Sequence, residues 1–280
     1  MKGEAAMIKY SYNTLVYAGE DIETSIARLS KFGYDGVEFV GEPEQQDRVL
    51  IKELLSKYSI AASTICAIYN PERDVISSRK EIRKNAVEYI KSCVDFAQFI
   101  GATGISLTPT ACMKIHQEAD RKTEFSWAVE GIKEAGTYAG EHGVRITVEP
   151  WNRYENYFIN RMEQSLELVH AIDLPSVGCM GDTYHMNIEE VDIGDAIRLA
   201  GDKLYHLHIA DSNRAAPGRG HIDFNPVKKA LQDINYSGYL TMELLPAFAD
   251  PFNGVRCEEF YDQYTEESIV FLKNLFKEEA

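Results

Sequence analysis

The sequence predicts an α/β fold, a single (β/α)8 TIM barrel, and two observations lead to this prediction. Short apolar runs typical of buried strands alternate with longer amphipathic segments typical of helices, and this alternation repeats eight times along 280 residues. Repeated strand-then-helix units imply parallel strands joined by right-handed crossovers, and eight such units suggest a closed barrel. The chain length agrees, because α/β barrels of roughly 250 residues are common as one unit.

The first four units are bounded by residues that start or stop helices. Asp21 suits the N-cap of the first predicted helix, Pro43 suits the first turn of the second, and Gly101 suits the end of the third. The predicted strands are 8–15, 36–40, 60–68 and 104–108, and the helices that follow them are 21–32, 43–58, 79–100 and 123–142.

The last four units repeat the same order. The predicted strands are 145–148, 177–180, 204–207 and 239–242, and the helices that follow them are 162–172, 188–200, 225–234 and 258–277. No low-complexity segment or Pro/Gly-rich linker divides the chain. We therefore expect one domain over residues 1–280, with residues 1–7 as a flexible leader.

The composition argues against several classes of protein. The chain has 44 acidic and 29 basic residues, a formal net charge of −15, whereas a nucleic-acid partner requires a basic surface. Five scattered cysteines without a CxxC pair predict reduced thiols and a cytoplasmic protein. No apolar run of about 18 residues and no signal-peptide pattern is present, so we expect no membrane partner.

Four of the predicted strands lead directly to metal-binding side chains, which are Glu149, Asp182, His208 and Glu243. In a parallel barrel the carboxyl ends of the strands meet at one face, the mouth, where active sites lie. Three carboxylates crowded there without a cation would repel one another, which would raise their pKa values. Carboxylate and imidazole ligands suit a divalent ion, so the sequence predicts a site for one divalent metal ion.

Further side chains near these strand ends suit the binding of a substrate. Glu155 follows Glu149 closely enough to reach back over the mouth, and Arg214 is a good donor for a polarised substrate oxygen. His185 is expected on a loop, where it could hydrogen-bond a substrate oxygen. Cys66 and Trp151 could form apolar walls, although such residues are more often simple packing.

Two other residues allow two interpretations each. Glu38, at the second predicted strand, either faces the mouth or is the partner of another side chain. His206 precedes His208 on the same face of its strand, and it is either a further ligand or a layer residue inside the barrel.

The residues around these strand ends resemble the sugar isomerase/epimerase superfamily of xylose isomerase-like TIM barrels. Within it they are most similar to the ketose 3-epimerases, which act on D-tagatose or D-allulose (psicose), and to their 5-keto-gluconate epimerase relatives. The resemblance covers nearly the whole chain and is strongest from Val148 to Glu243. The motifs that carry it are Glu149-Pro150-x-Asn152-Arg153-Tyr154-Glu155, Asp182-Thr183-Tyr184-His185-Met186-Asn187-Ile188-Glu189-Glu190, His208 with Ser212-Asn213-Arg214, Pro217-Gly218-x-Gly220, and Glu243.

The resemblance implies roles for these residues. Four ligands, Glu149, Asp182, His208 and Glu243, would hold one Mn²⁺, Co²⁺ or Mg²⁺, and Glu149 and Glu243 would also be the catalytic acid and base. Glu155, His185 and Arg214 match positions that hold the hydroxyls and carbonyl of the substrate. The resemblance also implies a homo-oligomer, a dimer or a tetramer.

The residues suit this chemistry on their own terms. A ketose whose carbonyl and adjacent hydroxyl bind a metal ion can lose the proton of the carbon between them, which gives an enediolate. One glutamate would take this proton, and the other would return a proton to the opposite face. We therefore expect a divalent-metal-dependent epimerase, most simply with Mn²⁺, that inverts a carbon next to the carbonyl of a ketose or keto-sugar acid.

Other functions are kept as alternatives. The first is the catalytic subunit of a C-glycoside deglycosidase, which would cleave a 3-keto glycoside by elimination in a hetero-complex with a small subunit. In that case the aromatic segment 247–264 would line the binding site of the aglycone. An endonuclease IV-like enzyme is disfavoured because the third and fourth strands end without histidine and the net charge is −15. A non-catalytic sugar- or metal-binding barrel is disfavoured because both glutamates that would do the chemistry, Glu149 and Glu243, are present. A xylose-type isomerase would need a catalytic lysine at the mouth, and Lys203 precedes its strand and so lies at the opposite end of the barrel.

Overall fold

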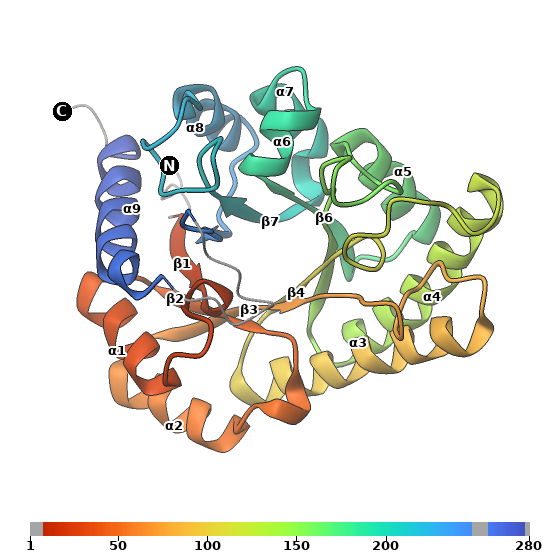
Figure 1. Cartoon of the computed structure of the whole chain (residues 1–280), viewed down its shortest axis with the longest axis horizontal. Helices are drawn as coiled ribbons and strands as arrows, with labels where there is room; N and C mark the ends of the chain where they lie inside the picture. The colour runs from red at the N-terminus through yellow and green to blue at the C-terminus, as the bar shows by residue number, and fades with distance from the viewer. Residues whose placement is uncertain (1–7, 248–256, 278–280) are drawn as a thin grey trace, which may run out of the picture.

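The computed structural model is a closed barrel of eight parallel strands in chain order, surrounded by helices (Figure 1). It describes residues 8–247 and 257–277, so the predicted leader, residues 1–7, lies outside the described part. Pairing of β1 with β8 closes the barrel and confirms the predicted fold class, while the assignment of one domain to residues 1–280 stays a prediction. The strands are β1 Lys9–Asn13, β2 Gly36–Val40, β3 Ala61–Ala67, β4 Gly104–Leu107, β5 Arg145–Val148, β6 Val177–Asp182, β7 Leu204–Ile209 and β8 Tyr239–Met242.

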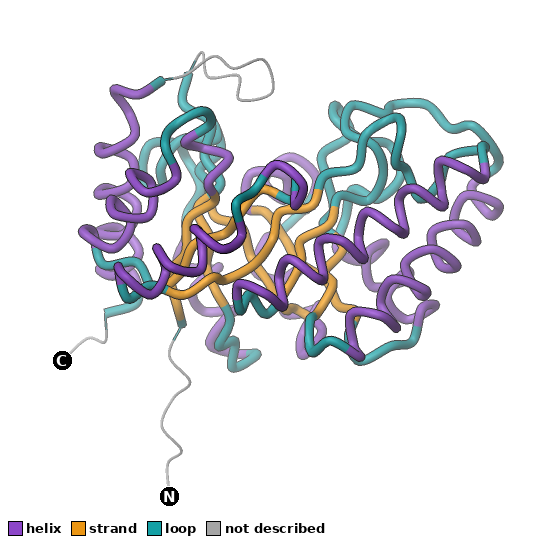
Figure 2. Tube along the Cα trace, turned by 90° about the horizontal axis from the view of Figure 1, so that it is seen from below, coloured by secondary structure: helices purple, strands orange, loops and turns teal. Residues whose placement is uncertain are grey.

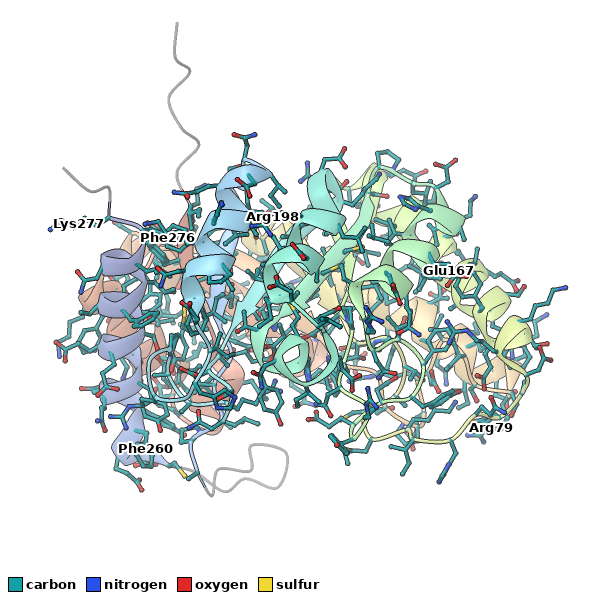
Figure 3. The ribbon with its side chains drawn as sticks, turned by 90° about the horizontal axis from the view of Figure 1, so that it is seen from above. Arg79, Glu167, Arg198, Phe260, Phe276 and Lys277 are labelled. Atoms are coloured by element: carbon teal, nitrogen blue, oxygen red, sulfur yellow. The ribbon has the colours of Figure 1, made fainter. Side chains whose placement is uncertain are left out.

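The helices return along the outside of the barrel, so the residues that precede them lie at the mouth. Arg79 before α3 and Phe260 before α9 lie at one edge of the molecule, and Phe276 after α9 lies at the other (Figure 3). Long loops gather on the mouth side of the strands (Figure 2). The helices are α1 Ile22–Phe32, α2 Arg48–Tyr58, α3 Lys80–Ile100, α4 Arg121–Glu141, α5 Met162–Ile172, α6 Thr183–Glu189, α7 Ile193–Ala200, α8 Phe224–Asp233 and α9 Tyr261–Leu275.

Two helices begin and end where the sequence predicts. The side chain of Asp21 accepts hydrogen bonds from the backbone N–H groups of Glu23 and Thr24 at 3.0 and 3.2 Å, which caps α1. Gly101 ends α3 with a φ of +86°, a left-handed conformation that costs glycine little.

Two other predicted helices are each divided in two, which corrects the prediction. The segment 43–58 forms a 3-10 turn, Pro43–Gln45, and α2 begins only after Asp47, whose side chain caps it. The segment 188–200 contains the end of α6 and the whole of α7, which is capped by Asp192. Each new start follows an aspartate that accepts backbone hydrogen bonds. His185 therefore lies within α6, and its predicted place on a loop is wrong.

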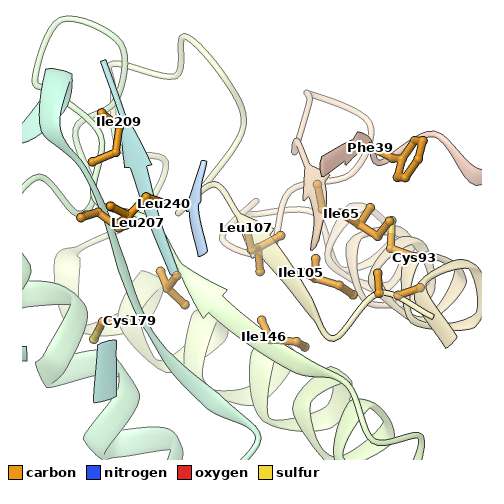
Figure 4. Close-up of a cluster of buried hydrophobic side chains, with 14 of the residues drawn as sticks. Phe39, Ile65, Cys93, Ile105, Leu107, Ile146, Cys179, Leu207, Ile209 and Leu240 are labelled. Carbon is orange, nitrogen blue, oxygen red and sulfur yellow. The ribbon is translucent and has the colours of Figure 1, made fainter. Parts of the chain in front are cut away.

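Side chains along the strands alternate between two environments. Those that face the helices are apolar, and Figure 4 shows this layer around Ile105, Leu107, Ile146 and Leu207. The alternate positions face the barrel interior and are mostly polar and buried. Many barrels fill this space with bulky branched residues. The polar interior side chains include Ser11, Glu38, Thr64, Ser106, Thr147, His206 and Thr241.

Two further observations concern the whole described chain. The five cysteines are free thiols. Among the described residues, no helix has the length and apolar character that crossing a membrane requires.

The close approach of α4 to β6 generates a stability prediction. A Cβ atom added at Gly136 would lie 2.5 Å from Val177 Cγ2 and 3.2 Å from Leu174 Cδ1. Gly136→Ala would gain about 1 kcal/mol of helix propensity, but overpacking costs roughly 1–3 kcal/mol. We expect this variant to lower the midpoint of urea unfolding, and Thr137→Ala on the exposed face of the same helix to leave it nearly unchanged. A midpoint for Gly136→Ala at or above that of the parent would contradict the close approach.

Candidate metal centre

The four predicted ligands converge at the mouth of the barrel. One ligand atom from each of Glu149, Asp182, His208 and Glu243 lies within 4.8 Å of the others, and all four residues are buried. We call these four residues the ligand cluster. The backbone N–H of Glu149 donates to the Leu107 carbonyl at 2.9 Å, which holds Glu149 directly after β5. The structure thus brings together the residues that the sequence singled out, while their binding of a metal stays a prediction.

The members of the ligand cluster offer buried atoms that the protein does not satisfy. Asp182 Oδ1 caps α6 by accepting a hydrogen bond from the Tyr184 N–H at 2.9 Å. Asp182 Oδ2, Glu149 Oε1 and His208 Nδ1 have no hydrogen-bond partner among the described residues. Buried polar atoms without partners are costly. A divalent cation would satisfy all three atoms, so the donor set fits one such ion.

His208 lies between carboxylates on both sides of its ring. Nδ1 is 3.4 Å from Glu243 Oε2 and 3.7 Å from Glu149 Oε1, and Nε2 is 2.9 Å from Glu38 Oε2. Burial alone would lower the pKa of His208, but the charges of Glu38 and Glu243 raise this pKa well above its ordinary value. A proton on the imidazole therefore offsets the negative charge around it when no cation is bound.

Glu243 is surrounded by hydrogen-bond donors. Oε1 accepts from Asn13 Nδ2 at 2.9 Å, Oε2 accepts from Arg214 Nη2 at 2.5 Å, and the Cys66 thiol lies 3.7 Å from Oε1. Burial would raise the pKa of Glu243, but His208 and Arg214 lower it to about 2. Glu243 is therefore ionised near neutral pH. Our sequence analysis missed Asn13, although it ends β1 as the ligand residues end theirs.

Arg214 connects the ligand cluster to the loops around it. Its guanidinium, in a side chain that is 12% exposed, also lies 3.4 Å from Asp182 Oδ2 and 4.6 Å from the centre of the Tyr184 ring. The backbone of Arg214 has a φ of +60°, and its carbonyl accepts a hydrogen bond from the Leu245 N–H at 2.8 Å. A left-handed conformation costs a non-glycine residue about 1–3 kcal/mol. The contacts on both sides of the residue hold this conformation and aim the guanidinium into the site.

His185 is neutral and oriented by its neighbours. Burial and the charge of Arg214 lower the pKa of His185 well below its ordinary value. Nδ1 accepts a hydrogen bond from the Asn152 backbone N–H at 3.2 Å, and Nε2 lies 3.4 Å from Arg214 Nη1, so both ring nitrogens face donor groups of the protein. Nε2 lies 3.8 Å from Asp182 Oδ2. The Trp151 ring stacks on the imidazole, with centroids 5.3 Å apart and planes at 22°. His185 thus presents Nε2 toward the ligand cluster and Arg214.

Asn152, which our sequence analysis did not assign a role, connects two predicted substrate-binding residues. Its side-chain Nδ2 donates to Glu155 Oε1 at 2.8 Å and lies 2.8 Å from His185 Nδ1. Asn152 is 1% exposed, so this contact is shielded from water. The spacing Asn152-x-x-Glu155 was visible in the sequence, but the contact with His185 depends on how the loop after β5 meets α6.

The structure places all five predicted substrate-binding residues at or beside the ligand cluster. Cys66 and Arg214 contact Glu243, and His185 approaches Asp182. Trp151 and Glu155 join the site through His185 and Asn152. Trp151 is 7% exposed and packs on His185, which agrees with the packing interpretation. The substrate roles themselves stay predictions.

Comparisons with known proteins agree with this geometry. The D-psicose 3-epimerase of Ruminiclostridium cellulolyticum is 34% identical over 231 residues, which cover 80% of this chain and 78% of that protein. The 3-dehydro-D-guloside 4-epimerase of Escherichia coli is 27% identical over 248 residues, which cover 85% and 92%. The crystal structure of D-allulose 3-epimerase from Methylomonas sp. in complex with D-allulose matches with a TM-score of 0.88 and 27% identity, over 96% of this chain and 97% of that one.

A comparison with protein-family models also supports the resemblance. The model described as xylose isomerase-like TIM barrel matches residues 26–273, nearly the whole barrel. The resemblance seen in the sequence is therefore confirmed. The chain belongs to the xylose isomerase-like TIM barrel family and is an enzyme of the isomerase group.

Proposed function

We propose that this protein is a divalent-metal-dependent epimerase that inverts the carbon next to the carbonyl of a ketose. The observation that carries the proposal is the pair of buried glutamates, Glu149 and Glu243, within one cluster that fits a single cation. They end β5 and β8, so they approach the cluster from different strands of the barrel. The ketose 3-epimerases among the relatives support a ketose as the substrate.

The residues of the site suit each part of the reaction. The ligand cluster would hold the ion, which would act as a Lewis acid toward the carbonyl oxygen of the substrate. Glu243, ionised by its donors, would remove the proton from the carbon next to the carbonyl. Glu149, whose Oε1 has no partner among the described residues, would return a proton to the opposite face. Exchange of these two roles would run the reaction in reverse. Arg214 and His185 would bind substrate oxygens, and the Arg214 guanidinium would stabilise the charge of the enediolate.

Several finer points belong to the same proposal. Mn²⁺ suits three carboxylates and one imidazole, and Co²⁺ or Mg²⁺ would be accepted by the same ligands. We also propose a homo-oligomer, a dimer or a tetramer, in the cytoplasm, on the strength of the family resemblance and the free cysteines.

A keto-glycoside is the second candidate substrate. The 3-dehydro-D-guloside 4-epimerase, 27% identical over 248 residues, favours it, and the same proton transfers would invert its carbon. Cleavage of a C-glycoside with a small subunit stays a prediction. The segment 247–264 on which it rested includes residues 248–256, which lie outside the described part of the chain.

Deuterium exchange tests the proposed reaction and identifies the carbon at which it occurs. The purified protein with Mn²⁺ would be incubated in D₂O with a panel of free ketoses and one 3-keto glucoside, and the products followed by NMR. We expect deuterium at one carbon next to the carbonyl, together with the epimer. Exchange with the keto-glucoside alone would replace a ketose by a keto-glycoside as the substrate, and no exchange with any sugar would refute the proposal.

Removal of either glutamate should stop this exchange. Glu149→Gln and Glu243→Gln keep the side-chain volume but lose the group that accepts or donates a proton, and such groups contribute roughly 10²–10⁴-fold to rates. We expect each variant to lose at least that factor in turnover while its circular dichroism spectrum is unchanged. Glu167→Gln, on the exposed outside of the barrel, is the control. Near-parental turnover by either site variant with added Mn²⁺ would remove that glutamate from the acid–base pair.

Arg214 should affect the transition state more than the fold. Arg214→Ala removes a partly buried donor to Glu243 and to the substrate oxygen. We therefore expect kcat/KM to fall roughly 10²-fold, which corresponds to a few kcal/mol of activation free energy. Arg219→Ala is the matched control, because Arg219 pairs with Glu267 at the surface. An unchanged kcat/KM for Arg214→Ala would show that its guanidinium does not act on the substrate.

Metal affinity should rise with pH around neutrality. Burial, together with the charges of Glu243 and Glu149, raises the pKa of Asp182 to about 7 in spite of Arg214, so below pH 7 a proton occupies a ligand atom. Deprotonation of Asp182 alone would increase the Mn²⁺ affinity by about tenfold from pH 6 to pH 8. Calorimetric titration in buffers of different ionisation enthalpy would measure the affinity and the protons released. A dissociation constant that is equal at both pH values would contradict this competition.

A further inference from the structure

The carboxylate of Glu38 reaches across the barrel interior to two histidines. Oε1 lies 3.2 Å from His206 Nε2, and Oε2 lies 2.9 Å from His208 Nε2. Glu38 belongs to β2 and both histidines to β7, which β1 and β8 separate in the closed sheet (Figure 1). None of the three side chains is more than 1% exposed. The contact therefore crosses the interior of the barrel and is shielded from solvent.

Other strands hold the Glu38 carboxylate in this position. Thr64 Oγ1 on β3 donates to Oε1 at 2.6 Å, and Ser106 Oγ on β4 donates to the same oxygen at 3.3 Å. With His206 also at Oε1, Oε2 is the oxygen that faces His208. Of the two interpretations of Glu38, the structure agrees with a partner for another side chain. His206 lies in the interior layer, and with Glu38 and His208 it also forms a group that could hold a metal ion, so both interpretations of His206 stay predictions.

The contact between Glu38 Oε2 and His208 Nε2 is a close ion-pair contact and not an aligned hydrogen bond, since neither atom has a hydrogen-bond partner among the described residues. Its position bears on how His208 faces the ligand cluster. A histidine that binds a metal through one nitrogen keeps its proton on the other, and a carboxylate beside the protonated nitrogen fixes the tautomer and the ring orientation. In His208 the nitrogen beside Glu38 is Nε2, and Nδ1 faces Glu149 and Glu243 at 3.7 and 3.4 Å. The ring therefore directs the lone pair of neutral Nδ1 to the place where the cluster converges.

We infer that Glu38 is a positioning residue of the metal centre, which fixes His208 with Nδ1 toward the ion, and that Thr64, Ser106 and His206 fix Glu38. The inference rests on the proposed function, because it requires that the ligand cluster binds a metal. It assigns no contact with the substrate to Glu38. The polar layer beneath the cluster is thereby part of the site and not only a filling of the barrel.

Metal binding, measured apart from turnover, tests this role. Glu38→Gln keeps the volume of the side chain and removes its charge, and loss of such a partner typically weakens metal affinity by about 10–100-fold. We expect that loss in the Mn²⁺ dissociation constant, measured by calorimetry, and a changed visible absorption spectrum of the Co²⁺-loaded protein. Thr64→Val, which is nearly isosteric, should weaken Mn²⁺ binding in the same direction but less.

Ser11→Ala is the matched control from the same interior. Its hydroxyl pairs with Ser63 at 2.6 Å, and Ser63 lies 3.4 Å from Thr64, so the substitution removes a buried hydrogen bond that does not itself hold Glu38. We expect the Mn²⁺ dissociation constant and the Co²⁺ spectrum of this variant to equal those of the parent. If Glu38→Gln does not fold, Thr64→Val with this control decides the matter.

The other outcomes overturn the positioning role, the epimerase proposal or both. Parental Mn²⁺ affinity in both Glu38→Gln and Thr64→Val would overturn the positioning role. Two ions per parent chain, of which Glu38→Gln loses one and binds the other with parental affinity, would make Glu38 a ligand of a second ion and overturn it also. A parent that binds Mn²⁺ but exchanges no sugar proton would refute only the epimerase proposal, whereas a parent that binds no Mn²⁺ would refute both.

Discussion

The rest of the site depends on the burial of three carboxylates and one imidazole within a single 4.8 Å cluster. Negative charges so near to one another raise the free energy of the ionised state, and burial raises this free energy further. The protein offsets part of this cost with the Arg214 guanidinium, the Asn13 amide and a proton on His208. Asp182 Oδ2 and Glu149 Oε1 are left without hydrogen bonds from the described residues. A bound cation is the simplest group that would satisfy both oxygens and release the proton.

Closure of the barrel is what makes this cluster possible. Glu149 and Glu243 follow β5 and β8, which are not neighbours. The parallel order places both residues at one edge of the sheet, and closure by the pairing of β8 with β1 curves that edge into the mouth where they meet. The two-residue period of the strands then sets a second polar layer beneath the first, since His206 lies one period before His208. The ligands and the residues that orient them are therefore products of one register.

Local pattern in the sequence was sufficient for the strands and for the strand-end residues, because each depends on a run of neighbouring residues. Helix starts were less predictable: the caps Asp47 and Asp192 divide segments whose periodicity suggested continuous helices. Contacts across the barrel could not be predicted, since the meeting of Glu38 with His208 depends on the strand order and tilt of the closed sheet. The same holds for Asn152 and His185, which meet between the loop after β5 and α6.

The polar interior is hard to explain as a contribution to stability. A buried carboxylate such as Glu38, even beside partners such as His206 and His208, stabilises a fold no more than apolar side chains of similar volume would. Apolar layers fill the interior of many barrels of this class. What the network supplies is geometry: Thr64 and Ser106 aim one carboxylate, and that carboxylate aims one imidazole. The interior beneath the mouth therefore contributes to the precision of the site, at a cost in stability that the apolar layer between barrel and helices must offset.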